Sequence, residues 1–442
     1  MAQKVSEWRK LPLSLSELCI DTTLRCGQSF RWRQINNEWH CALRGRIVSL
    51  RQDPSHLHYK VTWPKFAVEP LTPPASLTPA SLLSRDNDTG EDDTLSLLHD
   101  YFALSLSLDS LYKQWAASDP NFARRAPAFT GIRILNQDAW ETLVSFICSS
   151  NNNISRISQM VQKLCTYYGP YIGTVDGERL HDFPWPEALS GAAVEDHLRE
   201  LGFGYRAKYI AQTARRVAFD RPAGWLRQLR NPDFPAFDTS RAELRKMDGE
   251  SGTEPASYRA AHEALLILPG VGPKVADCVC LMGLGWGESV PIDTHVWQIA
   301  QRDYSFGKGG RTKTLTKTMY DAVGDHFRKI WGPQAGWAQS VLFTANLKSF
   351  AEQASAVKVK AVADAVKMED ISTLSSASSD LRTVTAKVED ATQAAAAVGR
   401  TRKRKIATPP AQPVKDEGKP GDVLQMGTPT PRRSKRRKAT AS

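Results

Sequence analysis

The sequence predicts an α+β protein in which an antiparallel sheet domain precedes a helical domain and a basic tail. Over residues 27–69, apolar and polar side chains alternate with the two-residue period of strands. From about residue 95 to 350 the apolar residues recur at helical spacing, and beyond 350 no stable apolar stripe remains. We therefore expect a β-rich domain at 1–129, a helical domain at 130–350 and a disordered tail at 351–442.

The sheet is predicted from two strand patterns and the turns beside them. In the clearer strand, polar residues separate four apolar ones, namely Leu57, Tyr59, Val61 and Trp63. Trp39, Cys41 and Leu43 indicate a second strand, with turns at Asn36-Asn37 and Asp53-Pro54-Ser55. Residues 70–94 are rich in Ser, Thr, Pro and Asp and predict a low-complexity surface loop. We also expect a surface insertion at about 221–256, for which the sequence suggests no function.

The charge of the chain is concentrated at its end. Of a net charge of +11 on 442 residues, the tail at 351–442 carries +8. If the rest of the chain binds a nucleic acid, that binding must therefore depend on local patches and backbone N–H groups. Two basic clusters, 402–405 and 432–438, predict recognition by the nuclear import machinery and hence a nuclear protein, with non-specific nucleic-acid contact as the ordinary alternative. A mitochondrial form stays open.

The remaining composition argues against several classes of protein. Seven cysteines form no convincing zinc spacing, so we expect no metal, and we expect no cofactor. No apolar stretch reaches membrane-spanning length and the N-terminus lacks the apolar core of a secretory signal, so we expect no membrane partner. We expect a monomer.

The most informative segment is LPGVGPK at 268–274, which predicts a tight hairpin between two helices. Ala264, Leu265 and Leu268 share one helical face, and Pro273 suits the first position of the next helix. Gly270 and Gly272 can adopt positive φ and leave backbone N–H groups accessible beside a helix N-terminus, where anions bind. The hairpin at Gly270, Val271 and Gly272 is therefore expected to bind a DNA phosphate.

Lys274 would lie in the first turn of that second helix. The helix dipole disfavours a protonated lysine there by roughly a few tenths to 1 kcal/mol, which favours the free amine that a nucleophile needs. An arbitrary lysine near a turn is usually just exposed, but this one is inside a phosphate-binding pattern.

Asp293 precedes the helical spacing of Val296, Ile299 and Ala300 and is expected to be an N-cap. A carboxylate held rigidly in this way can also stabilise positive charge that develops on a sugar.

These motifs resemble the helix-hairpin-helix DNA glycosylases, and within them the eukaryotic 8-oxoguanine DNA glycosylases. The hairpin and Asp293 are joined, in family order, by CGQSFRW at 26–32, SSNNN at 149–153, LGFGYRA at 201–207 and GWAQ at 336–339. The resemblance spans roughly residues 10–350 and implies a TBP-like sheet domain before the helix-hairpin-helix core. No cysteine follows Cys280, so the iron–sulfur cluster of endonuclease III-type relatives is not expected.

The resemblance implies a bifunctional glycosylase and lyase that acts on double-stranded DNA. A damaged guanine paired with cytosine is flipped out of the duplex, which requires a few kcal/mol of unstacking. Lys274 attacks the sugar C1′, a Schiff base forms, and β-elimination nicks the strand. Asp293 supports the cationic character of the sugar.

The same resemblance implies roles for the residues around the base and the DNA. Gly27 accepts the N7–H that distinguishes 8-oxoguanine from guanine. Cys278 and Phe343 sandwich the base, Gln339 meets its Watson–Crick edge, and Pro291 lines the pocket. On the DNA side, Asn151 fills the gap and reads the orphaned cytosine with Arg156 and Arg206. Tyr205 wedges into the opposite strand, and His295 contacts a phosphate or Asp293.

Three alternatives remain at this stage. Another glycosylase of the superfamily, for oxidised pyrimidines or alkylated bases, is the nearest, although relatives for alkylated bases generally lack the hairpin lysine. A non-catalytic DNA-binding module explains the hairpin but not Lys274 together with Asp293. A nuclear scaffold is supported by the tail alone.

Overall fold

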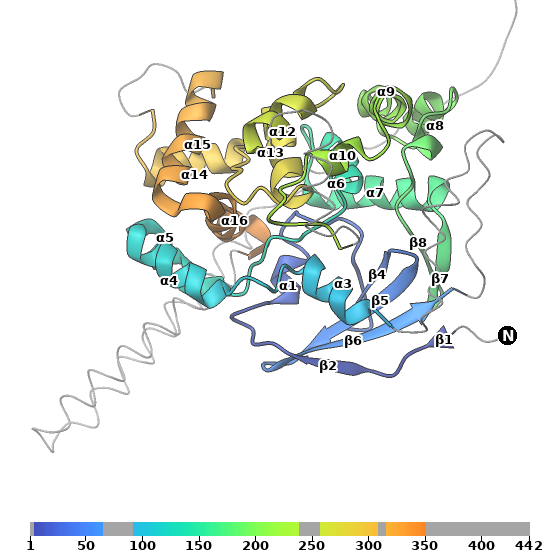
Figure 1. Ribbon diagram of the computed structural model, residues 1–442, viewed down its shortest axis with the longest axis horizontal. Coiled ribbons are helices and arrows are strands. Elements are labelled where there is room, and N and C mark those ends of the chain that lie inside the picture. The colour runs from blue at the N-terminus through green and yellow to red at the C-terminus, as the bar shows by residue number, and fades with distance from the viewer. Residues whose placement is uncertain (1–3, 65–91, 238–256, 308–314, 351–442) are drawn as a thin grey trace, which may run out of the picture. The chain divides into compact units, whose positions relative to one another are not determined.

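The computed structural model (Figure 1) describes residues 4–64, 92–237, 257–307 and 315–350. The tail at 351–442, predicted to be disordered, lies outside these described residues. Most of the predicted loop at 70–94 lies outside them as well.

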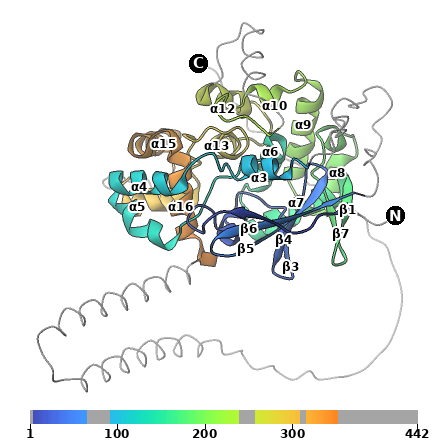
Figure 2. The same ribbon diagram turned by 60° about the horizontal axis from the view of Figure 1, so that its bottom comes forward.

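The first domain is built on an antiparallel sheet, as the alternation predicts. Its strands are β1 (Lys4–Val5), β2 (Arg9–Pro12), β3 (Arg33–Ile35), β4 (Glu38–Leu43), β5 (Arg46–Gln52) and β6 (His56–Trp63). They follow the order β1-β6-β5-β4-β3, and β2 also pairs with β6. In Figure 2 the sheet is seen nearly edge-on, below helices α3 and α13. Asn36 and Asn37 both have positive φ, as a tight two-residue hairpin requires. Leu57, Tyr59 and Val61 are buried against helices α1 (Ile20–Thr23) and α3 (Thr94–Tyr101).

The second domain is mainly helical and begins before the predicted boundary at residue 129, because Leu108, Trp115 and Phe122 pack in its core. Its helices are α4 (Leu108–Ser118), α5 (Pro120–Arg125), α6 (Ala139–Cys148), α7 (Ile154–Tyr168), α8 (Val194–Glu200), α9 (Arg206–Phe219), α10 (Trp225–Gln228), α12 (Tyr258–Leu266), α13 (Pro273–Met282), α14 (Thr294–Asp303), α15 (Lys317–Trp331) and α16 (Ala335–Asn346). Every residue of α6 is buried, and α6 packs against α7, α9, α10 and α13. Short 3₁₀ turns occur at Ala126–Ala128, Glu187–Leu189, Gly332–Gln334 and Lys348–Phe350.

One hairpin interrupts the region predicted to be helical. Strands β7 (Tyr171–Val175) and β8 (Glu178–His181) pair antiparallel, and the turn between them has positive φ at Asp176 and Gly177. An Asp-Gly pair between short β-forming segments is a hairpin signal, which the helical spacing on either side obscured. Ile172 and Leu180 pack with Ala42 of β4, so this hairpin, a separate two-stranded sheet, lies against the first sheet.

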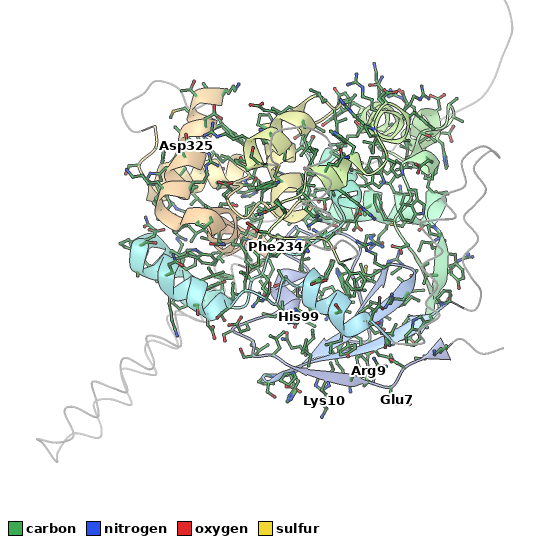
Figure 3. The ribbon with its side chains drawn as sticks, viewed as in Figure 1. Glu7, Arg9, Lys10, His99, Phe234 and Asp325 are labelled. Atoms are coloured by element: carbon green, nitrogen blue, oxygen red, sulfur yellow. The ribbon has the colours of Figure 1, made fainter. Side chains whose placement is uncertain are left out.

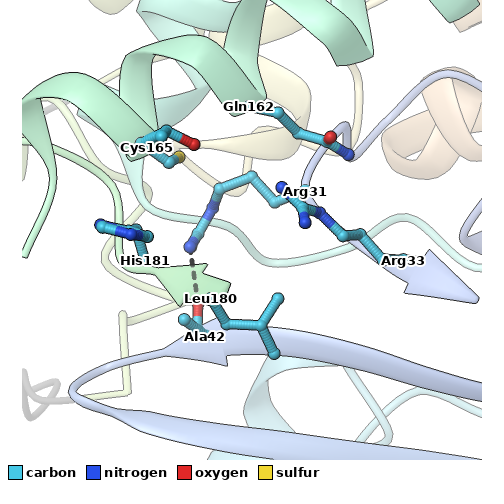
Figure 4. A pocket seen from close by; sticks show the side chains of 8 residues that line it. Arg31, Arg33, Ala42, Gln162, Cys165, Leu180 and His181 are labelled. Carbon is cyan, nitrogen blue, oxygen red and sulfur yellow. Dashed lines mark hydrogen bonds between the residues drawn. The ribbon is translucent and has the colours of Figure 1, made fainter. Parts of the chain in front are cut away.

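A buried cation, Arg31, also connects the two domains, and Figure 4 shows its hydrogen bond to the carbonyl of Ala42. The guanidinium of Arg31 donates to both carboxylate oxygens of Glu141 on α6, at 2.9 and 2.8 Å. It also donates to the carbonyl of Ala42 at 2.6 Å and to Asp182 at 3.1 Å. The sheet and the helices therefore share one set of charge-assisted bonds, which holds loop 26–32 in place.

The segment predicted as a surface insertion at 221–256 differs from that expectation in its described part, 221–237. Arg230 is only 4% exposed and donates to the backbone carbonyls of Gln137 and Gly283. Phe234, labelled in Figure 3, lies against Gly285 beyond the end of α13. Burial of these side chains makes 221–237 part of the helical domain, and 238–256 lie outside the described residues.

Candidate active site

The hairpin between α12 and α13 has the predicted geometry, with one refinement. Gly270 has φ +79°, and a Cβ there would lie 2.7 Å from Cβ of Tyr209, so both conformation and space require glycine. Gly272 is instead extended, with φ −102° and ψ 179°, and is the N-cap of α13, with Pro273 at the first helical position. No heavy atom lies within 4 Å of where its Cβ would be, so its backbone is open to a close partner.

Lys274 lies in the first turn of α13, directly after Pro273, and extends toward the end of α6. Its Nζ donates to Oγ of Ser149 at 3.2 Å and lies 4.7 Å from the ring centroid of Phe146. The side chain is half-buried. The packing of α13 on α6 thus holds the amine over an aromatic face, with one weak hydrogen bond fixing its direction. Ser149 lies in the SSNNN motif, but no contact of Ser149 or Phe146 with Lys274 was predicted from the sequence, because their proximity depends on this packing.

Asp293 is the N-cap of α14, as predicted. Its Oδ1 accepts the backbone N–H groups of His295 and Val296, both at 2.9 Å. These bonds use one carboxylate oxygen and fix the side chain at the helix N-terminus, where negative charge is favoured.

Cys278 is a buried thiol close to Lys274 in the sequence of α13. It follows Lys274 by one helical turn on the same face of the helix and is 2% exposed. Burial raises the pKa of its thiol to about 12, a charge on Lys274 acts in the opposite direction, and the charges of Asp277 and Asp293 raise it further. The thiol is therefore neutral at physiological pH.

The predicted base pocket is contributed by several elements. Gln339 and Phe343 lie one turn apart on α16, and Gln339 is buried. The ring of Phe343 meets that of His295 edge to face, with 5.8 Å between centroids, which brings α16 to the start of α14. Pro291 is buried in the segment before Asp293.

Gly27 lies beside the Asn-rich loop. It has φ +91°, and its Cβ position is 3.0 Å from Cδ1 of Ile154, the first residue of α7. Its neighbour Gln28 is buried and accepts a hydrogen bond from the N–H of Leu135. The loop that carries Gly27 is therefore held rigidly between the sheet and α7.

The predicted DNA-reading residues gather between α6 and α9. Asn151 is exposed with φ +47°, and Arg156 is exposed on the first turn of α7. Tyr205 is 49% exposed, and its hydroxyl donates to the carbonyl of Ser150 at 3.0 Å. Arg206 is 4% exposed and donates to the carbonyls of Ser150 and Asn151. Arg206 thus supports the loop that presents Asn151, a role that the sequence pattern did not indicate.

Other features bear on the class of site. Among residues 4–64, 92–237, 257–307 and 315–350, no group of three or more potential metal-ligating side chains occurs. Within the same residues, no helix is long and apolar enough to cross a membrane. A hollow of about 300 Å³ lies between Phe234 and Trp337, and its lining does not include Lys274 or Asp293.

Family models match both domains of the chain. Residues 10–143 match the model of the 8-oxoguanine DNA glycosylase N-terminal domain. Residues 144–322 match the HhH-GPD superfamily of base excision DNA repair proteins. The hairpin, the helical core and the lysine at the start of α13 thus define a base-excision DNA repair protein of the helix-hairpin-helix class.

Two relatives narrow this class. The chain is 40% identical over 359 residues to the N-glycosylase/DNA lyase of Saccharomyces cerevisiae. This alignment covers 76% of this chain and 85% of that protein. It is 35% identical over 345 residues to the N-glycosylase/DNA lyase OGG1 of Arabidopsis thaliana, with coverage of 77% and 80%. The chain belongs to the 8-oxoguanine DNA glycosylase family.

Solved structures share the fold at lower identity. The structure of MBOgg1 in complex with a low affinity DNA ligand aligns with a TM-score of 0.56 and 24% identity, over 78% of this chain and 98% of that one. A second structure is the 8-oxoguanine glycosylase/lyase of Clostridium acetobutylicum in complex with DNA containing cytosine opposite 8-oxoguanine. It aligns with a TM-score of 0.55 and 22% identity, over 74% of this chain and 91% of that one. Both likenesses concern the fold.

Proposed function

We propose that this protein excises 8-oxoguanine paired with cytosine from double-stranded DNA and then nicks the strand as an AP lyase. The observation that carries this function is Lys274, held in the first turn of the hairpin's second helix against the end of α6, with Asp293 fixed as the N-cap of α14. The names of the relatives, N-glycosylase/DNA lyase, and the Clostridium complex with cytosine opposite 8-oxoguanine support the choice of reaction and substrate.

The reaction begins with the neutral amine of Lys274. The amine forms a bond to C1′ of the flipped nucleotide, and the glycosidic bond breaks with its electron pair leaving on the base. Asp293 stabilises the positive charge that develops on the sugar. Loss of protons from the new nitrogen and opening of the sugar ring give a Schiff base. Removal of a C2′ proton then expels the 3′ phosphate and nicks the strand.

The substrate is recognised on two sides of the protein. In the base pocket, Gly27 accepts the N7–H of 8-oxoguanine, Cys278 and Phe343 contact the two faces of the base, and Gln339 meets its polar edge. Pro291 closes the pocket wall, and a neutral thiol suits contact with an uncharged ring.

Outside the pocket, Asn151, Arg156 and Arg206 read the cytosine and Tyr205 wedges into its strand. Arg206 can act through the position of Asn151 as well as directly, since it bonds the carbonyl of that residue. The hairpin at Gly270, Val271 and Gly272 binds a phosphate, with His295 near a second one.

Borohydride trapping tests the nucleophile. On a duplex with one 8-oxoguanine opposite cytosine, wild type is expected to give a covalent adduct and Lys274→Gln none. Lys317→Gln is the matched control, because Lys317 also lies in the first turn of a helix, α15, but is exposed. Excision without an adduct in wild type would exclude the lysine–sugar intermediate. Binding without excision would favour a DNA-binding module.

We further propose that the protein is a nuclear monomer. The pair of basic clusters at 402–405 and 432–438 supports the nuclear location. Replacing both clusters with Gln in a fluorescent fusion is expected to abolish nuclear accumulation. Retention in the nucleus, or a mitochondrial signal in the wild type, would revise this assignment, and light scattering of the full chain would measure the oligomeric state.

A further inference from the structure

The helix that carries Lys274, α13, also carries a carboxylate, Asp277, which the reaction above does not use. Asp277 follows Lys274 by three residues and is 1% exposed. Its carboxylate accepts the hydroxyl of Tyr258 at 2.5 Å, the hydroxyl of Ser289 at 2.9 Å and the hydroxyl of Tyr320. The Nε2 of His262 lies 3.7 Å from the same group. Burial of a carboxylate is unfavourable unless it is paired, and here hydroxyl groups provide most of the pairing.

The partners of Asp277 come from three separate parts of the helical domain. Tyr258 and His262 lie on α12, the first helix of the hairpin motif. Ser289 lies in the segment that joins α13 to α14, and Tyr320 lies on α15. One buried carboxylate thus connects the helix that carries Lys274 to the elements packed around it.

One of these connections reaches the segment that carries Asp293. The hydroxyl of Tyr320 donates to Asp277 and accepts the backbone N–H of Ile292 at 3.3 Å, one residue before Asp293. Ser289 donates to Asp277 a few residues earlier in the same segment. The segment 289–292 is therefore tied to α13 at two points, directly and through Tyr320.

We propose that Asp277 is a positioning residue, which sets the place of Asp293 relative to Lys274. This inference rests on the proposed function. The two reacting side chains lie on different elements, α13 and the start of α14, and the bonds to Asp277 join these elements inside the domain. Displacement of a catalytic group by about 1 Å can lower a rate roughly 100-fold, so the hydrogen bonds to Asp277 affect the rate of the chemical step.

The hydroxyl groups explain why a carboxylate is needed. Burial raises the pKa of Asp277, while the charge of His262 and the three hydroxyl donors act against that shift. An ionised carboxylate accepts from all three hydroxyls at once. Asparagine has the same shape but only one acceptor oxygen, so Asp277→Asn leaves at least one hydroxyl facing an NH₂ group.

Two tyrosines provide a matched pair for the test. Tyr258→Phe and Tyr320→Phe each remove one hydroxyl that donates to Asp277, but only the hydroxyl of Tyr320 also holds the N–H of Ile292. The ring of Tyr258 also contacts Arg328, whose guanidinium carbon lies 5.5 Å from the ring centroid, and phenylalanine keeps this contact. Arg328 is held in turn by Asp325 on α15 (Figure 3).

Single-turnover excision of 8-oxoguanine opposite cytosine is the measurement, with duplex affinity and melting temperature recorded for each variant. We expect Tyr320→Phe to slow excision about tenfold and Asp277→Asn about 100-fold. Tyr258→Phe should stay within about threefold of wild type, and the affinity of all variants should change less than about threefold, because no DNA contact is altered.

The outcomes separate this inference from the proposed function. Equal excision rates for the two tyrosine variants would overturn the positioning role while wild type still excises. Loss of affinity in parallel with rate would also overturn it, since it would indicate a general structural defect. If Asp277→Asn does not fold, the tyrosine pair still decides. A wild-type protein without excision would overturn both proposals.

Discussion

Two of the carboxylates that are buried in the described part of the helical domain, Glu141 and Asp277, are neutralised differently. Glu141 on α6 is 7% exposed and forms a two-bond ion pair with Arg31 from the sheet domain. Asp277 on α13 is 1% exposed and is surrounded by hydroxyl groups, with His262 at its edge. The first pair joins two domains, whereas the second group joins parts of one site.

This difference predicts different consequences of mutation. Removing Arg31 takes away the main countercharge of Glu141, so its effect should appear in the free energy of unfolding. Removing one hydroxyl near Asp277 leaves the others in place, so its effect should appear in the position of nearby groups and hence in a rate. A measurement of stability therefore reports on the Arg31–Glu141 pair, and a measurement of excision rate reports on the group around Asp277.

The largest expected effect is a loss of stability when the Arg31–Glu141 ion pair is broken. Arg31→Met should lower the free energy of unfolding by about 3–5 kcal/mol, because it leaves Glu141 buried without its partner. Urea denaturation measures this. Arg33→Met is the matched control, since Arg33 pairs with the mostly exposed Glu178 and its loss should change stability by about 0–1 kcal/mol. Similar losses in the two variants would contradict the structural role assigned to Arg31.

The next effect concerns Asp293, where chemistry and stability should separate. Asp293→Asn should slow excision by about 100-fold or more, because the amide cannot support a developing cation. Stability should fall by less than about 1 kcal/mol, since Asn is as good an N-cap as Asp. Asp138→Asn, the same change at the exposed N-cap of α6, should leave excision unchanged. If both variants excise normally, Asp293 is a cap and nothing more.

The sequence predicted the local features of the site and missed most of its connections. Helix starts at Pro273 and Asp293 follow from capping rules, which depend on neighbouring residues in the chain. The strand at 57–63 follows from its alternation for the same reason. The hydroxyls around Asp277 come from three elements, and no local pattern indicates that these will meet.

The segment 221–237 was misjudged for a related reason. Its Asn, Pro and Asp residues predict a loop, and the loop is present, but burial of Arg230 depends on carbonyl groups at Gln137 and Gly283. Similarly, the hairpin at 171–181 is stabilised by packing on Ala42, which is distant in the sequence. Local rules predict where elements begin and end, and long-range packing decides what they bury.

A smaller effect distinguishes the two glycines of the hairpin. Gly270→Ala should destabilise the protein by about 1–3 kcal/mol, because φ is +79° and Tyr209 occupies the Cβ position. Gly272→Ala should change stability by about 1 kcal/mol or less, because its backbone is extended and the space is open. Thermal denaturation compares them, and duplex binding of Gly272→Ala then tests whether that open backbone contacts DNA: unchanged affinity would argue against a phosphate there.

The smallest effect is expected for two thiols, one in each region. Burial raises the pKa of Cys41, in the sheet, and of Cys278, in the site, to about 12 each. Only about one thiolate in 10⁴ is then present at pH 8. Because this folded-state pKa exceeds the ordinary value of 9.0, each thiol leaves stability unchanged below about pH 9 and lowers it as the pH rises from 9 toward 12. Iodoacetamide at pH 8, followed by peptide mass spectrometry, should modify the partly exposed Cys19 and neither buried thiol. Labelling of Cys278 but not of Cys41 would mean that small molecules reach the site around Cys278 but not the sheet around Cys41. The two regions would then differ in their access to small molecules as well as in the way their buried carboxylates are paired.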